Sequence, residues 1–212
     1  MLTPYYDRNG ITLYLGDCWE ILPQITEKVD LVLTDPPYGI KRDKGFGGFG
    51  KPIARRRYEN DNWDSERPCS GTLQMVLAKS NRAMIFGGNF FADLLPQGRH
   101  WIVWDKLNTM PSFGDCELVW TNIDRNSVKK YTVEYNGLIG KEERRYHPTQ
   151  KPVELLELLI LDYSKDADLI LDPFLGSGTT AVAAKKLGRR CIGIEINEDY
   201  LKIAIERLRQ GV

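Results

Sequence analysis

The sequence predicts an α/β fold built around a mostly parallel sheet. Short apolar runs rich in β-branched residues alternate with segments of helical periodicity, and acidic turns follow two of these runs, Val29–Leu33 and Leu169–Leu171. Strands that alternate with helices form parallel sheets with both faces buried. Their carboxyl ends meet at one edge, where open α/β sheets bind ligands. The residues that follow these strands are therefore the first candidates for a functional site.

The N-terminal part of the chain predicts two strands, each followed by an acidic turn. Ile11–Leu15 alternates β-forming residues and stops at Gly16-Asp17, and weak helical spacing follows over Trp19–Ile25. The length and β-branched content of Val29–Leu33 predict a buried strand. The turn Asp35-Pro36-Pro37-Tyr38 comes next, and its two prolines fix two φ angles and remove two backbone donors. This turn is either a capped strand end or a stiff binding turn with a carboxylate and an aromatic ring.

The middle of the chain predicts a helix, a strand, a short helix and a hairpin. In chain order, these elements are Thr72–Lys79, Ala83–Phe86, Phe90–Leu95 and the two strands His100–Asp105 and Cys116–Thr121. We expect an antiparallel hairpin because a short connection with Pro111 and Gly114 joins the last two strands. Their tryptophans fit packing better than ligand binding, since aromatic residues dominate sheet surfaces.

The last third predicts a helix and then a strand–loop–helix–strand unit. Pro152 lies near the first turn of an apolar-periodic helix, where helices accept proline. After it come a strand at Leu169–Leu171, the Gly-rich loop Asp172–Thr180, a helix at Ala181–Leu187, a strand at Cys191–Glu195 and a helix at Asp199–Leu208. Such a crossover is right-handed, and its spacing resembles a nucleotide-binding fingerprint.

Composition bounds the class of protein. With 212 residues, 42% of them hydrophobic, we expect one globular domain over residues 1–212. Basic and acidic residues number 29 each, so any basic surface for nucleic acid is local. We expect a soluble, cytoplasmic protein without membrane contacts, because no leader and no bilayer-length apolar run occur. The four cysteines form no Cys-x-x-Cys pair, which predicts free thiols and no metal site.

Two polar stretches carry local positive charge. Gly39–Asn62 has seven basic residues against one acidic residue up to position 57, and its glycines alternate with Phe46 and Phe49. A solvated insertion is one interpretation, but we favour a loop that follows phosphates, since long loops in compact domains are usually functional or disordered. The second stretch, Asn122–Tyr146, which we also expect to be a loop, has six basic residues against four acidic ones.

The Gly-rich loop departs from the dinucleotide pattern. Instead of Gly-x-Gly-x-x-Gly, the sequence from Asp172 to Gly178 is Asp-x-Phe-x-Gly-x-Gly, so it lacks the third glycine that packs a helix beside a pyrophosphate. A nucleoside cofactor without phosphate would not need that glycine. Glu195 suits the two hydroxyls of a ribose, and Asp17 can accept from an adenine amine if the two strands are neighbours. These features fit S-adenosylmethionine.

The ordered set of motifs resembles the amino-directed DNA methyltransferases in the circularly permuted order called the beta class. The matching residues are Gly16-Asp17, Asp35-Pro36-Pro37-Tyr38, His147-Pro148-Thr149-Gln150-Lys151-Pro152, Asp172–Thr180 and Glu195. The resemblance spans nearly the whole chain. It implies a Rossmann-like S-adenosylmethionine-dependent methyltransferase fold, mostly parallel with one antiparallel hairpin strand and circularly permuted. It also implies methyl transfer to the exocyclic amine of adenine in double-stranded DNA, with base flipping.

The resemblance also assigns roles to residues. The catalytic residues are Asp35, Pro36, Pro37 and Tyr38. The cofactor-binding residues are Asp17, Cys18, Thr149, Lys151, Asp172, Phe174, Gly176, Ser177, Gly178, Thr179, Thr180, Glu195 and Ile196. The candidate DNA contacts from the two basic stretches are Lys41, Arg42, Lys44, Lys51, Arg55, Arg56, Arg57, Lys129, Lys130, Arg144 and Arg145. No metal is expected.

The chemistry explains these assignments. The amine of adenine or cytosine is a poor nucleophile, and the Asp35 carboxylate and the Pro36 carbonyl can accept both of its N–H groups. Tyr38 can stack on the flipped base. No covalent intermediate is needed, so no cysteine nucleophile is expected. Methylation of a cytosine carbon would need a thiolate, but the one Pro-Cys pair, Pro68-Cys69, lies in a polar stretch and not at a strand end, so we interpret it as incidental.

Several alternatives stay open at this point. Asp at the first position of the turn resembles the adenine-directed members, and methylation of the cytosine N4 amine is the alternative. A non-catalytic module that binds S-adenosylmethionine or DNA would be expected to have a damaged turn. A third alternative is an enzyme that methylates protein glutamine or RNA. Such enzymes usually place the turn after the Gly-rich loop, whereas here the turn comes before it. We expect a bacterial or phage modification enzyme, either stand-alone or paired with a nuclease, and a homodimer is an open alternative to a monomer.

Overall fold

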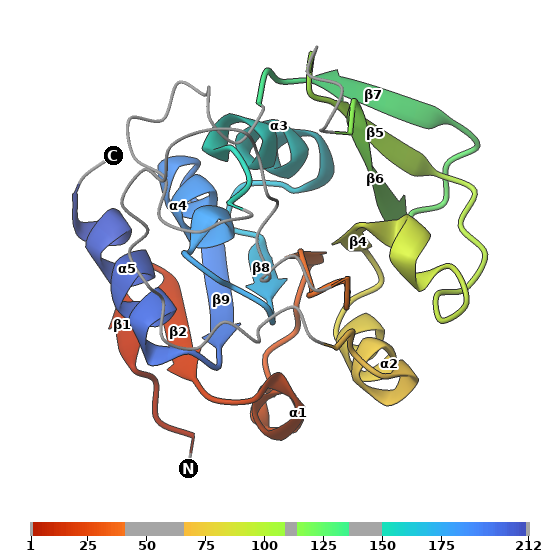
Figure 1. Ribbon diagram of the computed structural model, residues 1–212. Helices are drawn as coiled ribbons and strands as arrows, with labels where there is room; N and C mark the ends of the chain where they lie inside the picture. The colour runs from red at the N-terminus through yellow and green to blue at the C-terminus, as the bar shows by residue number, and fades with distance from the viewer. Residues whose placement is uncertain (1, 41–65, 109–113, 136–149, 211–212) are drawn as a thin grey trace, which may run out of the picture.

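The computed structural model describes residues 2–40, 66–108, 114–135 and 150–210. Through these residues runs one nine-stranded sheet in the order β1-β2-β9-β8-β3-β4-β6-β5-β7 (Figure 1). The strands are β1 (Tyr6–Arg8), β2 (Ile11–Leu15), β3 (Leu31–Thr34), β4 (Ala83–Phe86), β5 (Trp101–Asp105), β6 (Cys116–Thr121), β7 (Val128–Thr132), β8 (Leu169–Asp172) and β9 (Arg190–Glu195). The helices are α1 (Cys18–Ile21), α2 (Ser70–Ala78), α3 (Val153–Tyr163), α4 (Thr179–Lys186) and α5 (Glu198–Arg209), with 3-10 turns η1 (Leu22–Gln24) and η3 (Gly88–Phe91).

The centre of the sheet is parallel. Strands β2, β9, β8, β3 and β4 are consecutive neighbours and run in one direction. Strand β6 runs antiparallel to both β4 and β5, which confirms the predicted hairpin. The architecture confirms the predicted Rossmann-like α/β class. The circularly permuted chain order stays a prediction.

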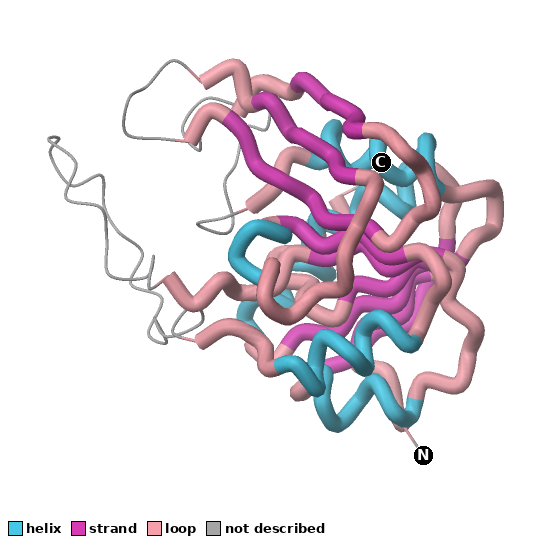
Figure 2. The backbone as a smooth tube through the Cα atoms, turned by 90° about the vertical axis from the view of Figure 1, so that its right-hand side faces the viewer, coloured by secondary structure: helices cyan, strands magenta, loops and turns pink. Residues whose placement is uncertain are grey.

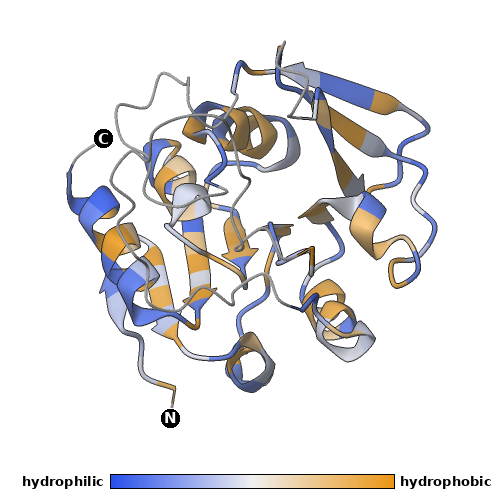
Figure 3. Cartoon of the chain, viewed as in Figure 1, coloured by the Kyte–Doolittle hydropathy of each residue, from blue (hydrophilic) through white to orange (hydrophobic). Residues whose placement is uncertain are grey.

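Helices cover both faces of this sheet (Figure 2). Leu31 and Leu33 of β3 face the apolar cluster formed with α3, α4 and α5, whereas Val32 faces the cluster formed with α1 and α2. All three are completely buried, as expected for a parallel strand covered on both sides. The central strand β8 is coloured as predominantly hydrophobic in Figure 3. This packing on both faces fixes the position of the edge at which the parallel strands end.

Some predicted elements differ from the structure. The stretch Asn122–Tyr146 was expected to be a loop, but it contains β7, which pairs in parallel with β5 at the outer edge of the sheet. Lysines are common on edge strands because they discourage pairing with other chains, and they hide the strand pattern here. Strand β1 was not predicted, and the helix expected at Phe90–Leu95 is instead the 3-10 turn Gly88–Phe91. The single-domain prediction stays a prediction.

All four cysteines are free thiols, which confirms that prediction. No helix in the described part of the chain is both long and apolar enough to span a membrane. Over the same residues, no group of His, Cys, Asp and Glu side chains could hold a metal ion.

Candidate active site

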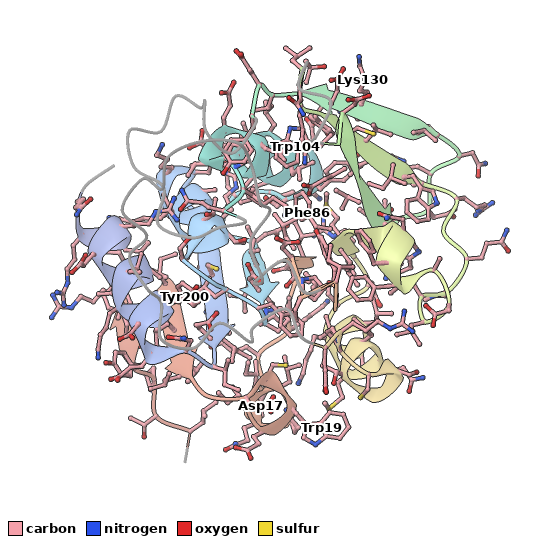
Figure 4. All side chains as sticks on the ribbon, in the orientation of Figure 1. Asp17, Trp19, Phe86, Trp104, Lys130 and Tyr200 are labelled. Atoms are coloured by element: carbon pink, nitrogen blue, oxygen red, sulfur yellow. The ribbon has the colours of Figure 1, made fainter. Side chains whose placement is uncertain are left out.

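The predicted acidic residues gather at the carboxyl edge of the parallel strands. Asp17 follows β2, Glu195 ends β9, Asp172 ends β8 and Asp35 follows β3. The strands of Asp17 and Glu195 are direct neighbours, with Leu15 opposite Glu195, as the assignment of Asp17 required. Figure 4 shows Asp17 at α1, on the same side of the molecule as the ends of these strands.

Asp35 is held from two sides. Its Oδ1 accepts a hydrogen bond of 2.6 Å from the Tyr38 hydroxyl, and its Oδ2 accepts one of 2.5 Å from Lys151 Nζ. The Asp35 side chain is 24% exposed, so one side of it remains accessible to solvent. Burial raises the pKa of Asp35 above its ordinary value, and the Lys151 charge offsets this only in part.

The Tyr38 ring has a fixed position beside Asp35. It stacks on Phe90 with the ring centroids 4.7 Å apart and an angle of 17° between the planes, and it meets Phe91 edge-on. The Gly87 backbone lies close against the ring, because a Cβ at this position would lie 2.5 Å from Tyr38 Cζ. Sequence reasoning missed this role of Gly87, although a glycine pair directly after a strand marks a close approach of backbone.

Lys151 connects Asp35 to a second carboxylate. Its Nζ lies 3.3 Å from Glu117 Oε2, and Glu117 Oε1 accepts from Lys106 at 2.6 Å. Burial alone would lower the pKa of Lys151, but the two carboxylates outweigh burial and raise it. Burial alone would raise the pKa of Glu117, but the two lysines outweigh burial and lower it. Lys151 was assigned to the cofactor, whereas its side chain bonds to the catalytic turn.

Glu117 was missed by sequence reasoning. It alternates with Val119 on β6, so the two side chains share one face of the sheet. Val119 is fully buried, and an acidic residue on the face of a buried neighbour is the signal that could have identified Glu117.

The Gly-rich loop is shaped by two glycines with positive φ. Gly176 has a φ of +56°, and a Cβ there would meet no heavy atom within 4 Å. Its N–H donates to Glu195 Oε2 at 2.7 Å. Gly178 has a φ of +84°, and a Cβ there would lie 2.5 Å from the Cβ of Ala204 in α5. Gly178 therefore allows the loop to pack closely against α5.

Two carboxylates hold this loop in place. Asp172 Oδ1 accepts from Thr34 Oγ1 at 2.7 Å and from the N–H of Phe174 at 3.1 Å, which ties the loop to the strand that carries Asp35. Burial raises the pKa of Asp172 to about 6. Burial likewise raises the pKa of Glu195 to about 7, and its Oε1 accepts from the N–H of Asn197 at 2.9 Å.

Arg207 is a further loop contact that sequence reasoning missed. From α5, its Nη1 donates to the Ser177 carbonyl at 2.8 Å and to Thr179 Oγ1 at 3.1 Å. Ser177 Oγ also donates to Gln150 Oε1 at 3.3 Å. Arg207 lies three residues after the buried Ala204, a spacing that places both on one helix face, so this face of α5 could have been expected to contact the loop.

The residues around α1 complete the edge. The Asp17 carboxylate accepts from the N–H of Trp19 at 2.8 Å and caps α1. The Cys18 side chain is buried in the core, and burial raises the pKa of its thiol to about 12. Ile196, which follows Glu195, is 69% exposed, so its side chain is available to a ligand.

The predicted DNA contacts are only partly described. Lys129 and Lys130 lie on β7, where they pair with Asp162 and Asp105 respectively, and Figure 4 shows Lys130 at the outer edge of the sheet. The following predicted residues lie outside the described residues: Lys41, Arg42, Lys44, Lys51, Arg55, Arg56, Arg57, Arg144, Arg145 and the cofactor candidate Thr149. The assigned site roles stay predictions.

Comparisons with known proteins give the family. The family model described as DNA methylase, of the N6/N4 type, matches residues 99–206. The type II methyltransferase M2.LlaDCHI of Lactococcus lactis subsp. cremoris is 30% identical over an alignment of 256 positions, which covers 100% of this chain and 94% of that protein. The chain belongs to the N6/N4 DNA methylase family.

Two further comparisons agree with this family. The type II methyltransferase M2.DpnII of Streptococcus pneumoniae is 31% identical over 253 residues, which cover 98% of this chain and 93% of that protein. The crystal structure of the M1.HpyAVI–SAM complex has a TM-score of 0.64 and 26% identity, and the match covers 93% of this chain and 98% of that one.

The edge of this DNA methylase fits S-adenosylmethionine, the cofactor of the family. Gly176 leaves room beside the loop for a ligand. Glu195 and Asp17 offer carboxyl oxygens as acceptors for hydroxyl and amine hydrogens, and the strand ends that carry them are neighbours. The exposed side chain of Ile196 can pack on a purine ring. The donor set therefore suits a nucleoside.

Proposed function

We propose that this chain transfers a methyl group from S-adenosylmethionine to the N6 amine of adenine in double-stranded DNA. One observation carries the proposal, namely the hydrogen bond of 2.7 Å between Thr34 and Asp172, which joins the catalytic turn to the cofactor loop. Asp35 directly follows Thr34, so the group that would hold the amine and the loop that would hold the methyl donor belong to one rigid unit.

Asp35 and Pro36 would activate the amine. The Asp35 carboxylate and the Pro36 carbonyl accept its two N–H groups, which withdraws the nitrogen lone pair from conjugation with the ring. When bound, S-adenosylmethionine supplies an electrophilic methyl group on a positively charged sulfur. The nitrogen lone pair forms the new N–C bond, the S–C bond breaks with its electron pair left on sulfur, and one amine proton is released. Close placement supplies much of the rate enhancement.

The existing partners of Asp35 are compatible with this role. An ionised carboxylate has about four lone-pair sites on its two oxygens. Asp35 can therefore accept from an amine while it still accepts from Tyr38 and Lys151. The parallel rings of Tyr38 and Phe90 offer the aromatic surface on which a flipped base would stack.

DNA would be held mainly by the two basic stretches. Positive side chains bind phosphates irrespective of sequence, and Gly39–Asn62 follows the catalytic turn directly. The Lactococcus relative matches over 256 residues, although this chain has 212, so that relative is the longer protein. We therefore propose a short recognition region over Asn122–Tyr146, shared with the first stretch.

A second candidate substrate is the N4 amine of cytosine. The same two acceptors would serve it, and Asp at the first position of the turn is the feature that favours adenine. A non-catalytic binding module is disfavoured because the four residues of the turn are intact.

Nucleoside analysis tests the proposal. The full chain is incubated with duplex DNA and methyl-labelled S-adenosylmethionine, and the DNA is then digested to nucleosides. We expect the label in N6-methyladenine. Label in N4-methylcytosine would replace adenine by the second candidate, and label in neither nucleoside would overturn the proposed function.

A further inference from the structure

Asp35 of the catalytic turn is the last member of a partly buried chain of alternating charges. Asp35, Lys151, Glu117 and Lys106 follow one another, with N–O distances of 2.5, 3.3 and 2.6 Å between successive members. They come from four places in the fold, namely the turn after β3, the residue before Pro152, strand β6 and the residue after β5. The Lys151 side chain is only 9% exposed. The methyl transfer outlined above gives no role to Lys151 or Glu117.

We propose that Lys151 is a positioning residue for Asp35, held in place by Glu117, and that it keeps Asp35 in the ionised form that accepts from the target amine. This inference rests on the proposed function, because it concerns the same catalytic turn. It replaces the role in cofactor binding that sequence reasoning assigned to Lys151.

The backbone and the packing both direct Lys151 at the turn. Pro152 restricts the preceding residue to an extended conformation, so Lys151 stays outside α3. Its Nζ lies 5.2 Å from the centre of the Phe86 ring and 5.8 Å from that of Tyr38. An ammonium group between two rings and two carboxylates has little freedom to move.

Charges from every neighbouring element act on Asp35. Tyr38 of the same turn donates a hydrogen bond, and Lys151 contributes a positive charge. Glu117 from β6 contributes a negative charge, Asp172 from β8 interacts electrostatically with Asp35, and Lys106 donates a hydrogen bond to Glu117.

Burial and the Glu117 charge therefore favour protonated Asp35, and Lys151 opposes them. A protonated Asp35 would present an O–H donor where the amine needs an acceptor. Loss of ionisation would then abolish the interaction on which the methyl transfer depends.

Replacing Lys151 and replacing Glu117 should shift the pH dependence of kcat in opposite directions. Lys151→Met removes the positive charge at nearly constant volume, so Asp35 ionises only at higher pH and the acid limb of kcat moves upward. Glu117→Gln removes a negative charge, so the acid limb moves downward, while a looser Lys151 lowers the plateau of kcat. A role in which Lys151 only stabilises the fold predicts no shift of the acid limb.

The experiment measures kcat and the KM for S-adenosylmethionine against pH in wild type, Lys151→Met, Lys151→Arg and Glu117→Gln. For Lys151→Met we expect an acid limb at least about one pH unit higher, so that kcat on that limb falls about tenfold, and a KM within about twofold. Lys151→Arg restores the charge and returns the acid limb toward that of wild type. The control Lys202→Met removes a lysine that is 53% exposed and should leave the profile unchanged.

Each other outcome overturns the inference. A raised KM with an unshifted acid limb would return Lys151 to the cofactor site. A loss of kcat that is equal at all pH values would reduce Lys151 to a structural residue.

A titration that needs no activity separates this inference from the proposed function. Carbon-13 NMR of labelled aspartate carboxyls follows Asp35 in wild type and Lys151→Met, with Asp35→Asn to assign the signal. We expect ionisation of Asp35 at higher pH in Lys151→Met, and equal ionisation in both proteins would refute the inference even if methyl transfer occurs. Absence of methyl transfer by wild type, together with the expected titration, would overturn only the proposed function.

Discussion

Gly87 offers a direct test of how tightly the catalytic turn is packed, because the chain contains a matched control. Gly87 and Gly188 both have a φ of +66°, which L-residues rarely adopt. A Cβ at Gly188 would meet no heavy atom within 4 Å, whereas a Cβ at Gly87 would lie 2.5 Å from Tyr38 Cζ. Alanine at either site therefore carries the same backbone strain, and only Gly87→Ala also displaces the Tyr38 ring.

The expected magnitudes follow from these contacts. The left-handed conformation costs alanine about 1 to 2 kcal/mol, so both variants lose at least this much stability. Gly87→Ala also breaks the hydrogen bond from Tyr38 to Asp35 and the stack on Phe90, which adds about 1 to 3 kcal/mol. Because these contacts shape the catalytic turn, we expect kcat to fall at least about tenfold in Gly87→Ala alone.

Denaturant unfolding and steady-state methyl transfer measure the two effects. Gly188→Ala should retain kcat within about twofold, because Gly188 follows α4 at a distance from the turn. Equal losses of stability and of kcat in the two variants would refute the packing of Tyr38 against Gly87.

Three further variants test other parts of the site. Arg207→Met should raise the KM for S-adenosylmethionine about tenfold in steady-state assays, because the loop loses a charge-assisted contact, whereas the exposed control Arg209→Met should not. Burial raises the pKa of Asp172 from 3.8 to about 6, so the folded state binds this proton more tightly than the unfolded state does. The contribution of this group to the free energy of unfolding is therefore lost as pH rises from about 4 to about 6. Asp172→Asn should flatten this decline of the free energy of unfolding with pH, measured by urea unfolding. An unchanged dependence on pH would contradict the role of burial. Tyr38→Phe should keep the ring stack but raise the acid limb of kcat, because the Tyr38 hydrogen bond lowers the pKa of Asp35; a profile identical to wild type would exclude that bond.

The central strands could be predicted from sequence because of their burial. A parallel strand covered by helices on both faces is a continuous apolar run, and β4 was found at its exact bounds while β3 and β8 were found within two residues. Strand β7 at the sheet edge has only Tyr131 buried among lysines and threonine, so its pattern resembles that of a polar loop. Strand β1 has three residues, too few for any periodicity.

Site residues could be placed from the sequence only where the order and direction of the strands determine their position. Acidic residues that end parallel strands must meet at one edge, and for this reason Asp17, Asp35 and Glu195 could be brought together in advance. Glu117 and Arg207 reach the site from an antiparallel strand and from the last helix. Sequence spacing gives the face of the strand or helix on which each side chain lies, but the partner that each side chain reaches depends on how these elements pack in the folded protein.

Methyl transfer and cofactor binding, measured together in Asp35→Ala, test the proposed role of the catalytic turn most directly. Wild type and variant are given duplex DNA and methyl-labelled S-adenosylmethionine, and the binding of S-adenosylmethionine to the same preparations is measured by calorimetry. We predict label in N6-methyladenine with wild type, no transfer with Asp35→Ala, and cofactor affinities within about twofold, since Asp35 would hold the amine and not the cofactor. Full transfer by Asp35→Ala would contradict the proposed role of the catalytic turn.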